Sequence, residues 1–114
     1  MKRLDQIPLK EHELRAIEAA ATFLRERLPV QKVVLFGSKA RGEDDPESDI
    51  DLLVLTERPL TRDEQRLVID LLFPLELEYD VGFSTMEIQA AEWEHGVYQV
   101  LPIRAEVERD GVAA

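Results

Sequence analysis

The stretch FGSKARGEDDPESDIDLLVL, residues 36–55, decides the fold of this 114-residue chain. It starts at the end of a short apolar run, residues 33–36, which is rich in β-branched side chains and predicts a buried strand that stops at Gly37. It ends in a second apolar run, residues 50–55, which predicts another buried strand. The polar segment between the runs contains Gly and Pro and predicts a turn.

The sequence on either side of this stretch predicts two helices. Apolar residues in steps of three and four predict a helix over residues 14–28, closed by Pro29. A second helix starts after Thr61, which can serve as its N-cap, and Glu64 completes a capping box. Because proline lacks a backbone N–H, we expect this helix to end at Pro74.

The rest of the chain predicts one strand and two more helices. Apolar and polar residues alternate strictly over residues 75–83, which predicts a strand with one covered face. Ser84 and Glu87 suggest a capping box for a helix that extends to about Glu94. Pro102 fits the first turn of a last helix, which ends near residues 110–111. The order predicts an α/β or α+β fold, with a small mixed sheet of three to four strands flanked by helices.

Composition limits the class of protein. Hydrophobic residues make up 45% of the chain and charged residues 33%, as in a globular protein, and we expect residues 1–114 to form a single domain. There is no cysteine, which excludes disulfides and thiolate zinc sites and fits a cytoplasmic location. No apolar stretch approaches the ~18 residues that a membrane-spanning helix needs.

The net charge is −10, from 24 acidic and 14 basic residues. A protein that grips a nucleic-acid backbone usually carries a basic stripe that neutralises phosphates, and the basic residues here are scattered among acids. We therefore expect no binding to long DNA or RNA. The acidic excess fits either solubility or complementarity to a basic protein partner.

Asp49 and Asp51 are the first candidates for a functional site. Residues two apart on a strand point to the same face, so the two carboxylates lie together and repel each other. Mg²⁺ relieves such repulsion, since it prefers carboxylate and phosphate oxygens. Asp80 lies on the polar face of the strand predicted over residues 75–83, and it joins the pair if the two strands are neighbours. The alternative is that Asp49 and Asp51 mark only the solvated start of a strand.

Gly37 and Ser38 are the second candidates. A glycine at the end of a strand lets the backbone approach a ligand closely, and N–H groups at a helix start can bind an anion. Lys39 and Arg41 could add positive charge, although an ordinary turn has the same composition. Arg41 could equally form a salt bridge to the acidic loop Glu43-Asp44-Asp45.

The C-terminal aromatic segment is predicted to be structural. Trp93, Tyr98 and Val100 are expected in the core, with an oligomer or partner contact as the alternative. His12 and His95 lie too far apart in sequence to show metal-ligand spacing.

Gly37-Ser38, ten residues, and then Asp49-x-Asp51 within SDIDLLV resemble the signature of the DNA polymerase β-like nucleotidyltransferases. The chain length and the pattern GSxARG…SDIDLLV resemble more specifically the minimal nucleotidyltransferases, the MNT group. The resemblance covers roughly residues 33–83 and implies the polymerase β-like fold. It implies two Mg²⁺ ions held by Asp49 and Asp51, with Asp80 as the third acid. Gly37 and Ser38 would then hold the β- and γ-phosphates of a nucleoside triphosphate, with Arg41 as a further phosphate contact.

The resemblance also implies a partner. Minimal nucleotidyltransferases pair with small helical HEPN proteins, which implies an antitoxin that transfers AMP from ATP to a tyrosine of a HEPN toxin. Two alternatives stay open. One is a nucleotidyltransferase that acts on a small hydroxylated molecule, and the other is a non-catalytic binding module that neutralises its partner by contact.

Overall fold

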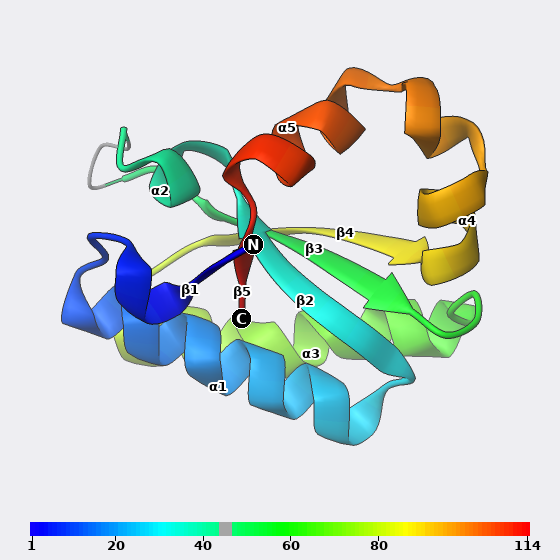
Figure 1. Cartoon of the computed structure of the whole chain (residues 1–114). Helices are drawn as coiled ribbons and strands as arrows, with labels where there is room; N and C mark the ends of the chain where they lie inside the picture. The colour runs from blue at the N-terminus through cyan, green and yellow to red at the C-terminus, as the bar shows by residue number, and fades with distance from the viewer. Residues whose placement is uncertain (44–46) are drawn as a thin grey trace.

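Two long helices lie side by side beneath a sheet (Figure 1). The computed structural model describes residues 1–43 and 47–114. The predicted N-terminal helix is α1, Glu11–Arg27, and the second is α3, Arg62–Tyr79. The predicted start of α3 is confirmed, because the Thr61 hydroxyl accepts a hydrogen bond from the Glu64 N–H at 3.1 Å and the Glu64 carboxylate accepts one from the Thr61 N–H at 2.9 Å.

The described residues form a five-stranded mixed sheet in the order β1-β5-β2-β3-β4. The strands are β1 Lys2–Arg3, β2 Val30–Phe36, β3 Ile50–Thr56, β4 Phe83–Gln89 and β5 Val112–Ala113. β3 pairs with β2 in the antiparallel sense and with β4 in the parallel sense. The mixed α/β class is confirmed, whereas the prediction of three to four strands is too low. β1 and β5 have two residues each, which is too short to produce a periodic pattern in the sequence.

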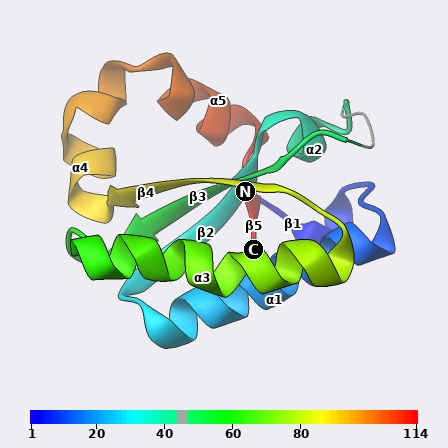
Figure 2. The ribbon, with the colours of Figure 1, turned by 180° about the vertical axis from the view of Figure 1, so that it is seen from behind.

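Shorter helices lie above the sheet, on the face opposite α1 and α3 (Figures 1 and 2). They are α2 Gly37–Arg41, α4 Ala90–His95, the 3₁₀ turn η2 Val97–Val100 and α5 Pro102–Asp110, while a further 3₁₀ turn, η1 Leu4–Gln6, precedes α1. The predicted last helix is α5, which starts at Pro102 as expected. Apolar side chains pack on both faces of the sheet. The upper cluster includes Leu53, Trp93 and Val107, and the lower one includes Ile17.

The predictions for residues 74–89 are wrong, whereas residues 90–94 lie in a helix, α4, as expected. Pro74 lies inside α3, which continues to Tyr79, so residues 75–83 do not form a strand. The strand in this region is β4, which starts only at Phe83. Ser84 and Glu87 lie in β4 and do not form a capping box. Val68, Leu72 and Leu75 on α3 are buried, so tertiary burial of this helical face outweighs the one hydrogen bond that proline cannot donate.

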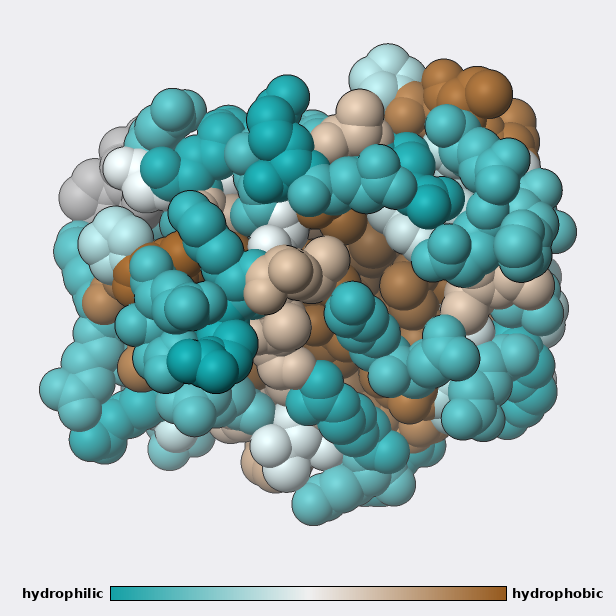
Figure 3. Space-filling model, viewed as in Figure 1, coloured by the Kyte–Doolittle hydropathy of each residue, from teal (hydrophilic) through white to brown (hydrophobic). Residues whose placement is uncertain are grey.

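The aromatic segment is partly as predicted. Trp93 is buried, and the centroid of its ring lies 5.9 Å from that of the half-buried Tyr98. Val100 is 83% exposed, so its predicted place in the core is wrong, because η2 turns it outward. An apolar patch on the connection from α4 to α5 is visible at the upper right of Figure 3. No helix in the described part of the chain is both long and apolar enough to cross a membrane.

Candidate functional site

Gly37 joins β2 to α2 in a left-handed conformation, with φ +77°, that glycine adopts without strain. Phe36, the last residue of β2, pairs with Asp51 of β3, which brings the Asp51 side chain to the turn. A Cβ atom added to Gly37 would collide with the Asp51 carboxylate. The carboxylate therefore lies directly against the backbone of the turn.

Asp49 and Asp51 flank the first residue of β3, and each lies against a glycine. Beside Asp49 the glycine is Gly82, where an added Cβ would collide with carboxylate Oδ1. The chain before β4 is fixed at this point, because the Ile50 N–H donates to the Gly82 carbonyl at 2.7 Å. On β3, Asp51 has the same orientation as Leu53, which belongs to the upper apolar cluster. The two carboxylates thus occupy one end of the sheet, on the side of α2 and α5.

Charge on Asp51 is disfavoured in the folded chain. Burial is the main cause that raises the pKa of Asp51, the carboxylates of Asp49 and Glu106 raise it further, and Arg41 acts in the opposite direction. Neighbouring carboxylates with costly charge fit a divalent cation such as Mg²⁺. Among the described residues no group of three or more acidic or histidine side chains could hold a metal. The fit therefore rests on Asp49 and Asp51, with other ligands from substrate phosphates and water.

Asp80 does not lie on a strand beside these two residues. It caps the C-terminal end of α3 in a left-handed conformation, with φ 55° and ψ 54°. It lines a polar pocket of about 300 Å³ together with Lys39 and Gly82. Ser84 occupies the β4 position opposite Asp51. The predicted strand position of Asp80 is wrong because α3 extends past Pro74, whereas its role as the third acid stays a prediction.

Arg41 contacts carboxylates at the end of α2. Its guanidinium lies 3.1 Å from a carboxylate oxygen of Glu43, 3.1 Å from one of Glu106 on α5, and 4.0 Å from one of Asp110. The hydrogen bond to Glu43 is the main cause that raises the pKa of Arg41. Residues 44–45 of the predicted acidic loop lie outside the described residues. The salt-bridge alternative thus holds for Glu43, and a phosphate contact by Arg41 stays a prediction.

A buried ion pair fixes α2 against α1. Lys39 Nζ lies 2.5 Å from Glu13 Oε2, and the two side chains are 2% and 6% exposed. The other carboxylate oxygen of Glu13 accepts a hydrogen bond from the Lys10 N–H at 3.1 Å. Since Lys39 directly follows Gly37 and Ser38, this pair fixes the turn that contacts Asp51.

Three contributors to the site escaped the sequence analysis. Gly82 falls within the strand predicted over residues 75–83, and only its tertiary position beside Asp49 reveals its role. Glu106 lies 65 residues from Arg41 in sequence, so no local pattern links them. Glu13 follows the start of α1 with a spacing that suggests helix capping, which gives no sign of its pairing with α2.

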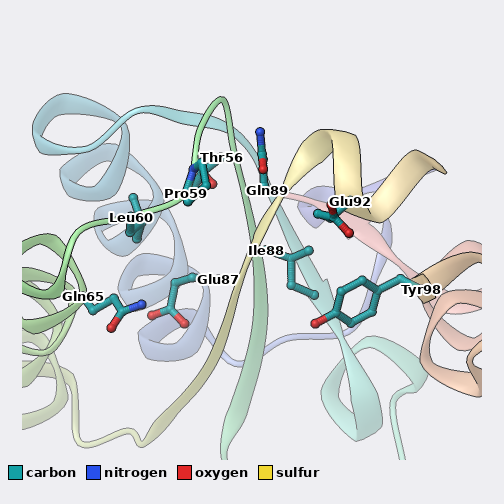
Figure 4. A pocket seen from close by; sticks show the side chains of 9 residues that line it. All are labelled: Thr56, Pro59, Leu60, Gln65, Glu87, Ile88, Gln89, Glu92 and Tyr98. Atoms are coloured by element: carbon teal, nitrogen blue, oxygen red, sulfur yellow. The ribbon is translucent and has the colours of Figure 1, made fainter. Parts of the chain in front are cut away.

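A second pocket lies at the opposite end of β3 (Figure 4). Its volume is about 260 Å³, and Thr56, the last residue of β3, is one of its lining residues. Glu87, Gln65 and Leu60 lie on one side of β4 in this view, and Ile88 and Tyr98 on the other. None of the predicted site residues lines it, so this pocket is separate from the aspartate pair.

Comparisons with known proteins agree with these observations. The profile of a family described as the nucleotidyltransferase domain matches residues 17–105. The chain is 39% identical, over 64 residues, to the Methanocaldococcus jannaschii protein MJ0141, a provisionally assigned protein adenylyltransferase. This match covers 56% of the chain and 63% of MJ0141, so the chain spans less than two thirds of that relative.

Solved structures share the fold. A provisionally assigned minimal nucleotidyltransferase is 26% identical with a TM-score of 0.60, and the match covers 91% of this chain and 95% of that one. A chain from the complex of a tri-AMPylated Shewanella oneidensis HEPN toxin with an MNT antitoxin is 18% identical with a TM-score of 0.52, covering 90% and 70%. At this identity the second likeness concerns the fold alone. The predicted polymerase β-like fold is confirmed.

Proposed function

The chain belongs to the nucleotidyltransferase domain family, and from this premise we propose that it transfers AMP from ATP to a hydroxyl group in the presence of Mg²⁺. The observation that carries the proposal is the placement of Asp49 and Asp51 beside the Gly37 turn. A metal-bound triphosphate requires carboxylates that hold the metal and, beside them, a turn whose backbone a phosphate can approach closely. A purely structural strand start has no need to bring these charges together.

Each predicted site residue has a role in this proposal. Asp49 and Asp51 would hold up to two Mg²⁺ ions, which supply charge neutralisation for the triphosphate. The backbone of Gly37 and Ser38 would face the β- and γ-phosphates. Arg41, already positioned by Glu106, would exchange a carboxylate contact for a phosphate contact.

The proposed reaction is an in-line displacement. The acceptor oxygen forms a bond to the α-phosphorus of ATP, the bond from this phosphorus to the β-bridging oxygen breaks, and pyrophosphate leaves. The acceptor proton goes to a carboxylate base. Asp80 is the proposed base and third acid, since it precedes Gly82 by two residues and lines the polar pocket that Gly82 borders.

The proposed acceptor is a tyrosine of a HEPN partner, as in an antitoxin of a toxin–antitoxin pair. MJ0141 is a provisionally assigned protein adenylyltransferase, and the Shewanella oneidensis complex contains an AMPylated HEPN toxin, which together favour a protein acceptor. The net charge of −10 is compatible with a basic partner surface.

The test is label transfer with Mg²⁺ and ATP to the proteins that copurify with this chain. Label on the α-phosphate should reach a second protein, whereas label on the γ-phosphate should leave with pyrophosphate. The Asp49→Ala, Asp51→Ala double variant should transfer neither label. The Asp63→Ala, Asp70→Ala variant is the matched control, because it removes two exposed carboxylates on α3, across the sheet from the site.

Two other results would replace the proposal. A stable partner complex that acquires no label, and that still neutralises the partner with both aspartates removed, would favour a contact-only binding module. Label on a small hydroxylated molecule in place of a protein would keep the chemistry and change the acceptor.

A further inference from the structure

Helix α3 carries an apolar ridge on its solvent side. Ile69, Phe73 and Leu77 are 67%, 55% and 71% exposed. Their spacing of four residues aligns them along one side of the helix. The opposite side of α3 buries Val68 and Leu72, so this helix already packs on the core of the chain through another apolar face. The ridge has no role in packing the described part of the chain.

Charges of opposite sign lie at the two ends of the ridge. Arg62 and Arg66 are exposed at the N-terminal end of α3, and Arg66 lies on the ridge side, three residues before Ile69. Glu78 and Asp80 are exposed at the C-terminal end, where the helix dipole adds partial negative charge. None of these four side chains forms an ion pair within residues 1–43 and 47–114.

We propose that α3 binds the α3 helix of a second copy of this chain, antiparallel and about a two-fold axis that passes near Phe73. Ile69 and Leu77 lie four residues on either side of Phe73, so the two-fold places each against the other residue of the second copy. The same operation brings Arg66 of one copy to Asp80 of the other, since each lies seven residues from Phe73. Since the chain carries a net charge of −10, association of two copies requires such local pairing, and Arg66 supplies it.

The position of α3 keeps this dimer away from the Asp49–Asp51 pair, while Asp80, at the end of α3, belongs both to the proposed dimer contact and to the proposed site. α3 lies beneath the sheet, whereas α2 and α5 lie above it (Figure 2). Asp51 has the same orientation as Leu53 of the upper apolar cluster, so the Asp49–Asp51 pair lies on the side of α2 and α5. With 18 residues, α3 is about 27 Å long, so the ridge provides a full helix-length contact. The inference does not depend on the proposed transferase activity.

The test is the mass in solution, measured by sedimentation equilibrium and light scattering. The wild-type chain of 13.1 kDa should give twice that mass. Phe73→Ser should give the monomer mass while retaining the wild-type circular dichroism, because the side chain is exposed in the single chain. The matched control is Val100→Ser, which removes an apolar side chain that is even more exposed than Phe73, lies on the upper face and should leave the dimer intact.

A charge exchange tests the antiparallel orientation. Arg66→Glu should weaken the dimer at least tenfold, and adding Asp80→Arg to it should restore most of the affinity. A wild-type chain that stays monomeric up to its solubility limit would overturn the proposal. So would a dimer that Val100→Ser dissociates and Phe73→Ser does not.

Discussion

The carboxylate of Asp51 lies against the backbone of Gly37, so closely that a single added Cβ atom would overlap it. The contact joins the turn after β2 to the start of β3. It arises because Phe36, the residue before Gly37, pairs with Asp51 in the sheet. It gives a reason for glycine at position 37 in addition to the left-handed backbone, since any side chain would overlap the carboxylate. The phosphate turn and the metal carboxylates of the proposed site are thus parts of one rigid unit.

Gly37→Ala should abolish Mg²⁺-dependent nucleotide binding, measured by calorimetry, because the new methyl group displaces Asp51. Gly42→Ala is the matched control: Gly42 has a similar φ of +71°, but its added Cβ would meet only Pro8 Cγ at 3.4 Å. Both variants should lose about 1–2 kcal/mol of unfolding free energy from the left-handed backbone. Equal retention of nucleotide binding in the two variants would contradict the contact.

Asp51→Asn should increase the free energy of unfolding at pH 7 in metal-free buffer. Burial, Asp49 and Glu106 raise the pKa of Asp51 above its ordinary value of 3.8, so the charged form costs the folded state free energy that the unfolded state does not lose. This cost is present above the folded-state pKa and vanishes as the pH falls below 3.8, so the gain should vanish there too.

Chemical denaturation across this pH range checks the prediction, with Asp70→Asn, exposed in the middle of α3, as the control that should show no comparable gain. The same Asp51→Asn variant should lose transferase activity and Mg²⁺-dependent nucleotide binding. Full activity in it would remove Asp51 from the proposed metal site.

Glu13→Gln should destabilise the fold in urea denaturation by about 1.5–3 kcal/mol, because it removes a carboxylate that lies 2.5 Å from the buried Lys39 Nζ. A loss below about 1 kcal/mol, as for an exposed pair, would contradict a stabilising role for the Glu13–Lys39 contact.

Residues 72–89 show where sequence patterns mislead. Leu75, Leu77 and Tyr79 alternate with acids, as in a strand, but Leu72, Leu75 and Tyr79 also follow helical spacing. The two patterns differ at Leu77, which a covered strand face would bury and which is 71% exposed. Pro74 favours a strand prediction for the residues that follow it, because proline usually ends a helix. Only the packing of α3 beneath the sheet stabilises the helix over these residues.

Pro74→Ala should stabilise the chain, by at most about 3 kcal/mol, because alanine restores a hydrogen-bond donor within α3 and has the highest helix propensity. Thermal and urea unfolding would measure this gain. Pro59→Ala, outside any helix, is the control and should bring no increase. Destabilisation by Pro74→Ala would contradict a continuous α3.

The candidate site was predictable where its residues are local in sequence. Gly37 and Asp51 lie at the two ends of adjacent strands joined by one short connection, so the order of elements alone brings them together. Gly82 and Glu106 reach the site through the parallel β3–β4 pairing and the return of α5 over the sheet. Such tertiary contacts leave no periodic signal in a single sequence.

The most direct measurement is the mass of the HEPN partner after coexpression with this chain in its native cells. The account predicts that the partner carries the added mass of AMP on a tyrosine with the wild-type chain, and that the addition is absent with Asp49→Ala, Asp51→Ala. The Asp63→Ala, Asp70→Ala control should modify the partner like wild type. An unmodified partner beside the wild-type chain, or a modified one beside the double aspartate variant, would contradict the account.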